Sequence, residues 1–354
     1  MNIKLLTSAP KKLALLLLYY SVIRKKECGK GLKILTYHRI SDKQDLDDPL
    51  KVSLESFEGQ MRYLEENFHI LSGDELTRII RKGRGFPEKS CLITFDDGWS
   101  DNYTNAFPVL KKRGIPALIF VTTDFIGKNR VFWHERLRQT LLRSSGESAG
   151  RFIGEGVRPE AARKQIKSIL MKARSGRAAA INRLVEALKP FDATELETLA
   201  ENLEKELGVN TEKDGHLMLS WEQIREMSSG GVTFGSHTKS HAILTQIDRV
   251  SVVEELRASK QIIERETKKP AHYLAYPNGT FDSEIAGVAK DLGYLAGFTC
   301  VPGINSFCNE VFVLRRNHVN EEMNLGLSGC FSEELFKVEL TGLRTTLRNL
   351  LNKN

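Results

Sequence analysis

The stretch Cys91–Gly98, CLITFDDG, joins a run of apolar residues to two adjacent carboxylates and a glycine. A short apolar run that stops at a turn signal is typical of a strand buried on both faces. Asp96 and Asp97 then fall where the strand ends, which is the edge at which α/β folds bind their ligands. Neighbouring residues of an extended chain point to opposite sides, so both acids face one spot only if the backbone bends, and Gly98 permits a bend. For this pair taken alone, an acidic turn without function is the alternative.

The flanking segments predict a parallel sheet. Asn105–Arg113 reads as a helix ended by Gly114, and Ala117–Thr122, ALIFVT, as another apolar strand. A strand, a helix and a strand in succession form a βαβ unit. Leu32–Tyr37 is predicted to be the first strand, and His38 follows it at the level where a barrel places its pocket. A chain of 354 residues can hold one large α/β barrel with additions.

Composition and charge exclude several classes of protein. With 41% hydrophobic and 27% charged residues, the chain is globular rather than disordered. The net charge of +7 arises in residues 1–40, which hold nine Lys or Arg and one acid, whereas the rest of the chain carries 43 bases and 44 acids. No nucleic-acid partner is therefore expected. The five cysteines show no CxxC spacing, so neither a disulfide framework nor a cysteine zinc site is predicted.

Residues 1–31 form a basic, apolar N-terminal segment. Leu13–Ile23, LALLLLYYSVI, is uncharged and lies between a lysine pair and the basic cluster Arg24–Lys26. As a helix it would be roughly 16 Å long, about half of the hydrocarbon thickness of a bilayer. No small-residue cleavage site follows, which argues against a secretory signal. We expect an interfacial helix on an anionic membrane surface, and hence a bacterial cytoplasmic protein bound peripherally to the inner membrane; a packed helix is the alternative.

The middle of the chain has a different pattern. From residue 132 to 215, apolar residues recur at helical spacing among many charged ones, and Asp192 before Glu195 resembles a helix-capping box. This predicts an all-helical insertion that serves as a lid, a partner surface or decoration. The predicted division of the chain is an N-terminal segment 1–31, a first barrel part 32–131, the insertion 132–215, a second barrel part 216–320 and a C-terminal helical region 321–354.

Two histidines follow a later predicted strand. Val232–Gly235 leads into SHTKSH, in which His237 and His241 are four residues apart. An isolated HxxxH pair is a weak signal for a metal site. Two imidazoles together with a strand-end carboxylate are nevertheless a recurring catalytic arrangement, because they leave metal positions open for water and substrate.

Five ordered motifs carry a resemblance to a known family. They are TFDDG at 94–98, SHTKSH at 236–241, YPNG at 276–279, LGY at 292–294 and LRRNHV at 314–319. In this order and spacing the chain resembles the polysaccharide deacetylases with a NodB-type homology domain, carbohydrate esterase family 4, and in particular the members of bacterial exopolysaccharide systems. The resemblance covers about residues 32–130 and 216–320.

The resemblance implies a distorted (β/α) barrel and a metal-dependent hydrolase. Asp96 would be the general base, while Asp97, His237 and His241 would hold a divalent metal, expected to be Zn²⁺, that activates the attacking water. The resemblance also implies that His318 is the proton donor and that backbone N–H groups near Asn278 stabilise the oxyanion. The implied substrate contacts are Tyr276, Pro277 and His38.

The sequence departs from the family at two motifs. The family's Arg-x-Pro-Tyr has Ala275 in place of its arginine, so the group that orients the base must come from elsewhere, and Arg315 or Arg316 could supply that charge. The family's acidic and tryptophan motif is also absent, which leaves Asp291 and Tyr294 as the nearest equivalents.

The predicted function is removal of N-acetyl groups from acetylamino-sugar residues of a polysaccharide or a lipid-linked glycan. One alternative is removal of a formyl or other acyl group from a lipid-linked sugar, which the N-terminal segment makes reasonable. The other is a catalytically silent glycan-binding barrel, although all four positions of the base and the metal ligands are filled. The oligomeric state is not predicted.

Overall fold

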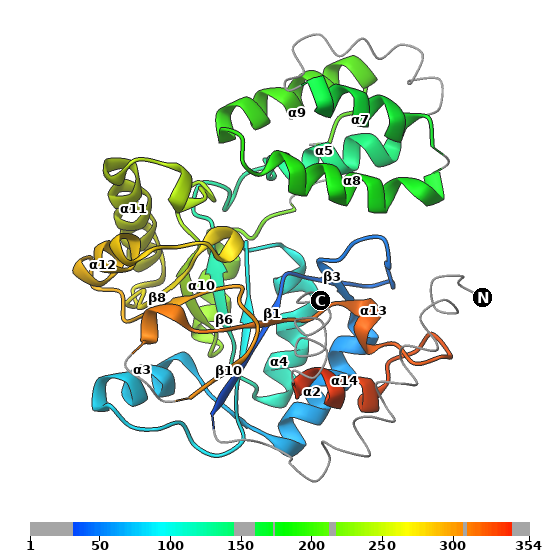
Figure 1. Cartoon of the computed structure of the whole chain (residues 1–354). Coiled ribbons are helices and arrows are strands. Elements are labelled where there is room, and N and C mark those ends of the chain that lie inside the picture. The colour runs from blue at the N-terminus through cyan, green and yellow to red at the C-terminus, as the bar shows by residue number, and fades with distance from the viewer. Residues whose placement is uncertain (1–30, 145–159, 173, 212–216, 307–309, 342–354) are drawn as a thin grey trace, which may run out of the picture. The chain divides into compact units, whose positions relative to one another are not determined.

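The computed structural model describes residues 31–144, 160–172, 174–211, 217–306 and 310–341. The chain divides into two compact units, one formed by the residues up to Ile126 and from Leu219 onward, the other by Gly127–Met218. Figure 1 shows a sheet with surrounding helices in the first unit and a group of helices in the second. The predicted interfacial helix and the end of the C-terminal helical region lie outside the described residues.

A mainly parallel sheet forms the centre of the first unit. Its spatial order is β10-β1-β5-β6-β7-β8-β9, with β4 beside β5 and β11 beside β1. Each neighbouring pair is parallel except β1 and β10. The bounds are β1 Leu32–Tyr37, β4 His69–Ile70, β5 Ser90–Phe95, β6 Leu118–Val121, β7 Thr233–Ser236, β8 Tyr273–Ala275, β9 Ala296–Phe298, β10 Ile304–Asn305 and β11 Asn317–His318. A separate parallel pair consists of β2 Arg39–Ser41 and β3 Lys51–Ser53.

The sheet curves into the predicted distorted (β/α) barrel, which closes between β9 and β1. Phe298 at the end of β9 forms a parallel bridge with Leu314, and β11 then pairs with β1. A strand at 311–315 is expected from the sequence, and this prediction is wrong, because Val311–Val313 form the 3₁₀ turn η7. The Phe312 carbonyl accepts a hydrogen bond from the Tyr276 hydroxyl (3.1 Å) instead of one from the backbone of a neighbouring strand.

Helices connect the strands and cover the outside of the barrel. Their bounds are α2 Leu54–Asn67, α3 Gly73–Lys82, α4 Phe107–Arg113, α10 Trp221–Ser229, α11 Arg249–Thr267, α12 Ser283–Asp291, α13 Glu321–Asn324 and α14 Glu333–Leu340. A π-helical turn η3 (Asn102–Ala106) precedes α4, and the 3₁₀ turns η5 (Leu244–Gln246) and η6 (Pro277–Gly279) follow β7 and β8. Local sequence explains several ends: the Ser220 hydroxyl and the Gln223 side chain form a capping box on α10, and Gly83 ends α3 in the left-handed conformation.

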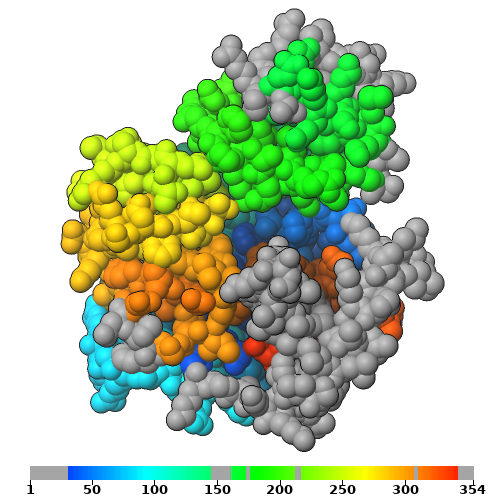
Figure 2. Space-filling model, in the orientation of Figure 1, coloured from blue at the N-terminus to red at the C-terminus, as the bar shows by residue number. Residues whose placement is uncertain are grey.

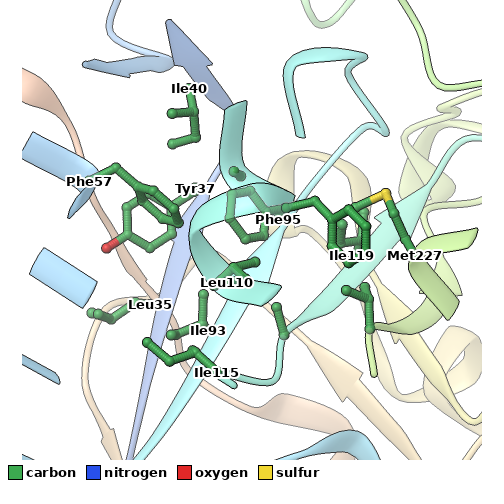
Figure 3. Packing of buried hydrophobic residues seen from close by; sticks show 14 of the residues in the cluster. Leu35, Tyr37, Ile40, Phe57, Ile93, Phe95, Leu110, Ile115, Ile119 and Met227 are labelled. Carbon is green, nitrogen blue, oxygen red and sulfur yellow. The ribbon is translucent and has the colours of Figure 1, made fainter. Parts of the chain in front are cut away.

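Alternation along β5 divides its side chains between two cores. Cys91, Ile93 and Phe95 belong to the cluster between the sheet and the helices, whereas Leu92 belongs to the cluster inside the barrel. Figure 3 shows part of the outer cluster, in which Phe95 lies near Tyr37 and Phe57; the Tyr37 and Phe95 rings are 5.4 Å apart between centroids. Because the period is two, the next inward position after Leu92 and Thr94 is Asp96.

The second unit has a core of its own. Its helices are α5 Trp133–Arg143, α7 Glu160–Leu170, α8 Arg174–Leu188 and α9 Ala193–Leu207. Leucine and isoleucine side chains from all four helices pack together. The buried guanidinium of Arg177 donates hydrogen bonds to the carbonyls of Leu141 and Leu170 in the last turns of α5 and α7 (3.2 and 2.8 Å), which would otherwise be unsatisfied. The Asp192 carboxylate caps α9, and Gly208 ends it in the left-handed conformation.

Figure 2 shows one face of the barrel unit, on which the yellow residues adjoin the orange residues that follow them in the chain. Among the described residues, every helix is too short or too polar to cross a bilayer.

Candidate active site

The two carboxylates lie where β5 ends, as the sequence predicts. Asp96 and Asp97 are each almost fully buried, at 2% and 3% exposed. The turn needs two consecutive left-handed residues, Asp97 with φ 77° and Gly98 with φ 87°. The bend therefore begins at Asp97 itself, one residue earlier than Gly98 alone would place it. It turns the Asp97 carboxylate towards His237 and His241.

Arg316 is the partner of Asp96. Its two terminal nitrogens donate to the two carboxylate oxygens of Asp96 at 2.7 and 2.8 Å, a bidentate ion pair. Arg316 is 2% exposed, and its Nε donates to the Thr299 carbonyl. Arg315, in contrast, is exposed. Of the two arginines considered as replacements for the one missing at Ala275, the structure selects Arg316.

This ion pair controls the charge of Asp96. Burial by itself would raise the pKa of Asp96, but the positive charge of Arg316 and the nearby His237 lower it below the usual value. Asp96 is therefore a carboxylate at neutral pH. Oδ2 of Asp96 lies 4.0 Å from Nε2 of His237. The Asp96 carboxylate can therefore accept a proton beside this histidine.

Asp97, His237 and His241 converge on one point. The Oδ1 atom of Asp97 lies 3.5 Å from Nε2 of His237 and 3.4 Å from Nε2 of His241. The two histidines meet because the turn after β7 places Thr238 and His241 at positive φ. Their rings are 4.9 Å apart between centroids, in an edge-to-face arrangement.

The geometry fits a four-coordinate metal. Tetrahedral zinc bonds of about 2.0–2.1 Å place neighbouring ligand atoms about 3.3–3.4 Å apart, which matches the separations of Asp97 from both histidines. Nδ1 of His237 lies 2.8 Å from the Ala275 carbonyl and donates to it, so Nε2 keeps its lone pair for a cation. Burial lowers the pKa of His237 to about 4, which keeps the ring neutral. Among the described residues, this is the single cluster of at least three His, Cys, Asp or Glu side chains placed to hold a metal ion.

Trp99 is a site residue that the sequence reading missed. Its indole N–H donates to Oδ2 of Asp97 at 2.9 Å, which leaves Oδ1 directed at the histidines. The Arg39 guanidinium lies over the indole, 4.6 Å from the ring centroid, and pairs with Asp101 at 2.8 Å. The available signal was its position, since a tryptophan directly after FDDG can fold back on the second acid.

His38 and His318 lie together beside the carboxylates. β11 pairs with β1, and the two rings are 5.2 Å apart between centroids. Nδ1 of His38 and Nε2 of His318 are buried and have no partner among the described residues. Burial and the neighbouring His38 lower the pKa of His318 to about 3. The imidazole is therefore neutral in the resting site, and a proton that it donates must reach it during turnover.

The Tyr276–Gly279 motif divides between core and surface. Tyr276 and Pro277 are buried, and the Tyr276 ring stacks on Phe281 at 4.9 Å between centroids. The Tyr276 side chain is thus part of the core and presents no surface to a sugar. Asn278, in contrast, is exposed and adopts a positive φ of 58°.

The proposed equivalents of the acidic and tryptophan motif lie elsewhere. Asp291 and Tyr294 precede β9, at its N-terminal end, whereas the candidate catalytic groups follow the C-terminal ends of the strands. Asp291 is exposed, and the buried Tyr294 hydroxyl donates to the Leu256 carbonyl. Both residues therefore lie towards the end of the barrel opposite to the candidate site.

Comparison with known proteins agrees with this site. The family model described as polysaccharide deacetylase matches residues 83–169 and 181–297, more than half of the chain. The chain belongs to the polysaccharide deacetylase family, and it is a hydrolase of that class.

Individual relatives extend the match. YxkH of Bacillus subtilis strain 168, whose name provisionally marks it as a polysaccharide deacetylase, is 25% identical over 312 residues, 88% of this chain and 79% of that protein. The poly-β-1,6-N-acetyl-D-glucosamine N-deacetylase of Staphylococcus epidermidis is 36% identical over 106 residues, 26% of this chain and 36% of that protein. The solved structure of the Streptococcus pyogenes deacetylase PplD in complex with acetate superposes with a TM-score of 0.54 at 20% identity, covering 84% of this chain and 95% of that one, which supports the fold.

Proposed function

We propose that the protein removes N-acetyl groups from acetylamino-sugar residues of a polysaccharide or lipid-linked glycan, with a divalent metal, Zn²⁺, as cofactor. The observation that carries the proposal is the convergence of Asp97, His237 and His241 beside a carboxylate held in its charged form by Arg316. A base without a metal site, or a metal site without a base, would suit binding as well as hydrolysis. Residues suited to both roles lie within one group here, in which His241 is partly exposed.

The residues divide the reaction between them. Asp97, His237 and His241 would hold the metal, which when bound polarises the acyl oxygen and favours ionisation of water. As the water oxygen attacks the acyl carbon, Asp96 accepts the water proton. Collapse then breaks the carbon–nitrogen bond, and the leaving nitrogen takes up a proton, for which His318 is the proposed donor. The products are acetate and a glycan in which that sugar residue carries a free amino group.

The substrate class rests on the relatives. The Staphylococcus epidermidis protein is named for an N-acetyl-D-glucosamine polymer, and its similarity covers 26% of this chain. We therefore propose an N-acetylhexosamine exopolysaccharide or its lipid-linked precursor as the substrate. Backbone N–H groups near Asn278 are the proposed stabilisers of the oxyanion, and His38 is a proposed substrate contact.

The test is release of acetate and of formate from a panel of N-acylated hexosamine oligomers, with and without a chelator. We expect acetate to exceed formate, activity to disappear on chelation, and Zn²⁺ to restore it. Asp96→Asn should lower kcat by about 10²–10⁴-fold, the usual contribution of a general base, without loss of bound metal. His237→Ala should lose the metal as well.

The matched control is Asp291→Asn, an exposed acid at the opposite end of the barrel, which should keep full activity. Full activity of Asp96→Asn, or activity indifferent to chelation, would defeat the proposal. Formate released in preference to acetate would replace it with deformylation.

A further inference from the structure

A cavity of about 510 Å³ opens at the end of the barrel opposite to the candidate catalytic residues. Its lining includes Thr233 and Tyr273, the first residues of β7 and β8, whereas the active site follows the last residues of those strands. Helix α3, at the lower left of Figure 1, forms one wall. The volume is within the range of about 300–1,000 Å³ that is typical of small-molecule sites.

One face of α3 supplies cations to this cavity. Asp74, Thr77, Arg78 and Arg81 all line it, and their spacing of three, four and seven residues places them along one side of the helix. Lys269 faces them from the segment between α11 and β8. Three cationic residues and the single carboxylate of Asp74 leave the lining with an excess of positive charge among the described residues.

The two arginines are not committed to other charges. Within the described residues, neither Arg78 nor Arg81 forms an ion pair, and Nε of Arg78 makes only a long contact of 3.4 Å with the Asp74 carbonyl. Lys269 donates to the Ser228 carbonyl at 2.5 Å, which holds its ammonium group at the cavity. Two guanidinium forks and a fixed ammonium group are a typical arrangement for a phosphate.

His272 lines the same cavity and carries an unsatisfied polar atom. Its Nδ1 is buried and has no hydrogen-bond partner among the described residues. Burial lowers the pKa of His272, and the charges of Lys260 and Arg81 lower it further, against the opposing effect of Glu264 and Asp74. A buried polar atom without a partner is costly unless a ligand or water completes it.

The cavity also has an apolar side. Val232, Phe234 and Pro270 line it together with the Tyr273 ring. Cations on one wall and apolar groups on another suit a phosphate that carries an organic group better than a free inorganic ion.

We propose that this cavity binds an organic phosphate through Arg78, Arg81 and Lys269, at a site separate from the catalytic metal centre. The phosphate would lie between the two guanidinium groups, and its organic part against Val232 and Phe234. The ligand is either a soluble sugar phosphate or the phosphate of a lipid headgroup, which share this chemistry.

The test measures binding to the full chain by calorimetry and thermal shift at constant ionic strength. The probes are inorganic phosphate, glucose 6-phosphate and phosphatidylglycerol vesicles, each with and without chelator. The variant is Arg78→Gln with Arg81→Gln. The control, Arg62→Gln with Lys82→Gln, removes equal charge from exposed positions of α2 and α3 that do not line the cavity.

We expect saturable binding of at least one organic probe, and this binding should survive chelation and be tighter than that of inorganic phosphate. In the double variant the affinity should fall by about tenfold or more, because charge-assisted hydrogen bonds are lost. The control should bind like the wild type. Tighter binding of glucose 6-phosphate identifies a soluble ligand, and binding of vesicles alone identifies a lipid headgroup. Absence of saturable binding, loss of binding on chelation, or equal binding by the double variant would overturn the proposal.

Discussion

A buried arginine takes the place of the motif arginine that this chain lacks at Ala275. Arg316 reaches Asp96 from the segment that closes the barrel, and its guanidinium also lies over the Phe120 ring at 5.5 Å. A buried ion pair adds little net stability by itself, yet removing one partner leaves an uncompensated charge. The chief effect of Arg316 is therefore to keep Asp96 ionised and oriented.

Replacing Arg316 should move the pH dependence of the reaction. In Arg316→Met the pKa of Asp96 rises, because burial is no longer opposed by the guanidinium. A base works only when ionised, so the acid limb of kcat/KM should move to higher pH. The free energy of unfolding should also fall by about 3–5 kcal/mol.

Arg316→Lys keeps the charge without the bidentate contact and should shift the limb less. Arg315→Met, at the exposed neighbouring position, is the matched control and should leave the profile unchanged. Profiles of pH against kcat/KM would check this, and an unmoved acid limb in both Arg316 variants would refute the role.

His318 should make the fold sensitive to acid. Its pKa is about 3 in the folded protein, against about 6.5 in an unfolded chain. Between these values the unfolded state binds more protons, so stability falls as pH falls from about 6.5 towards 3, by up to about 1.4 kcal/mol per pH unit.

His318→Gln should therefore lose less stability than the wild type between pH 7 and pH 4.5, as measured by denaturant unfolding of metal-free protein. His69→Gln, which removes an exposed histidine, is the control. Parallel losses in the wild type and in His318→Gln would contradict this prediction.

At the scale of the element, the turn after β5 sets the geometry of the site. Asp97 and Gly98 are two successive residues with positive φ. The turn directs the Asp96 carboxylate to Arg316 and the Asp97 carboxylate to the two histidines. A left-handed conformation at a residue with a side chain costs roughly 1–2 kcal/mol. The cost is tolerated where strands and helices on both sides determine the backbone, as they do here.

Gly98→Ala should disturb this turn more than an ordinary glycine substitution would. At a φ of 87° the new Cβ would lie 2.9 Å from Ile126 Cδ1 and 3.1 Å from Val121 Cγ1. Strain and crowding together should cost about 2–4 kcal/mol and reduce metal affinity by moving Asp97.

The control, Gly83→Ala at the end of α3, has a similar positive φ but open space around the new Cβ. It should cost only about 1 kcal/mol and leave activity intact. Denaturant unfolding and metal titration of both variants would test the pair, and equal effects would count against the crowding argument.

Most elements were predictable from local patterns. Leu32–Tyr37 is a strand with the expected bounds, the predicted strand Ala117–Thr122 contains β6, and the predicted helix Asn105–Arg113 contains α4, which ends at the expected residue. Apolar periodicity and capping residues act over a few positions, so a short window of sequence contains them. The 3₁₀ turn at Val311–Val313 was missed because β-branched residues favour a strand, while the tertiary contact of the Phe312 carbonyl favours a turn.

At the scale of the whole molecule, the barrel brings distant segments together at one end. The two carboxylates of the candidate site follow β5, the histidine pair lies in and after the turn that follows β7, and Arg316 lies in the closing segment. A parallel barrel places all strand ends of one sense at the same face, which is why such separated motifs form one site.

Residues 1–30 should attach the protein to membranes. This prediction comes from the sequence, since the segment lies outside the described residues. Deletion of residues 1–30 should abolish sedimentation with phosphatidylglycerol vesicles, and substitution of the cluster Arg24–Lys26 by glutamine should weaken it, because cations near anionic lipid each contribute about 1 kcal/mol. Neutral vesicles are the control. Sedimentation that the deletion leaves unchanged would exclude the interfacial helix.

Three features could be predicted from the sequence, because each depends on neighbouring residues. They are the strand that ends in two acids, the histidine pair four residues apart, and the family to which these motifs belong. Three other features depend on the folded chain: Arg316 pairs with Asp96 across 220 positions, Trp99 orients Asp97, and the Tyr276 side chain belongs to the core. These three features depend on closure of the barrel. The way in which the last strands meet the first determines which side chain lies beside a buried charge.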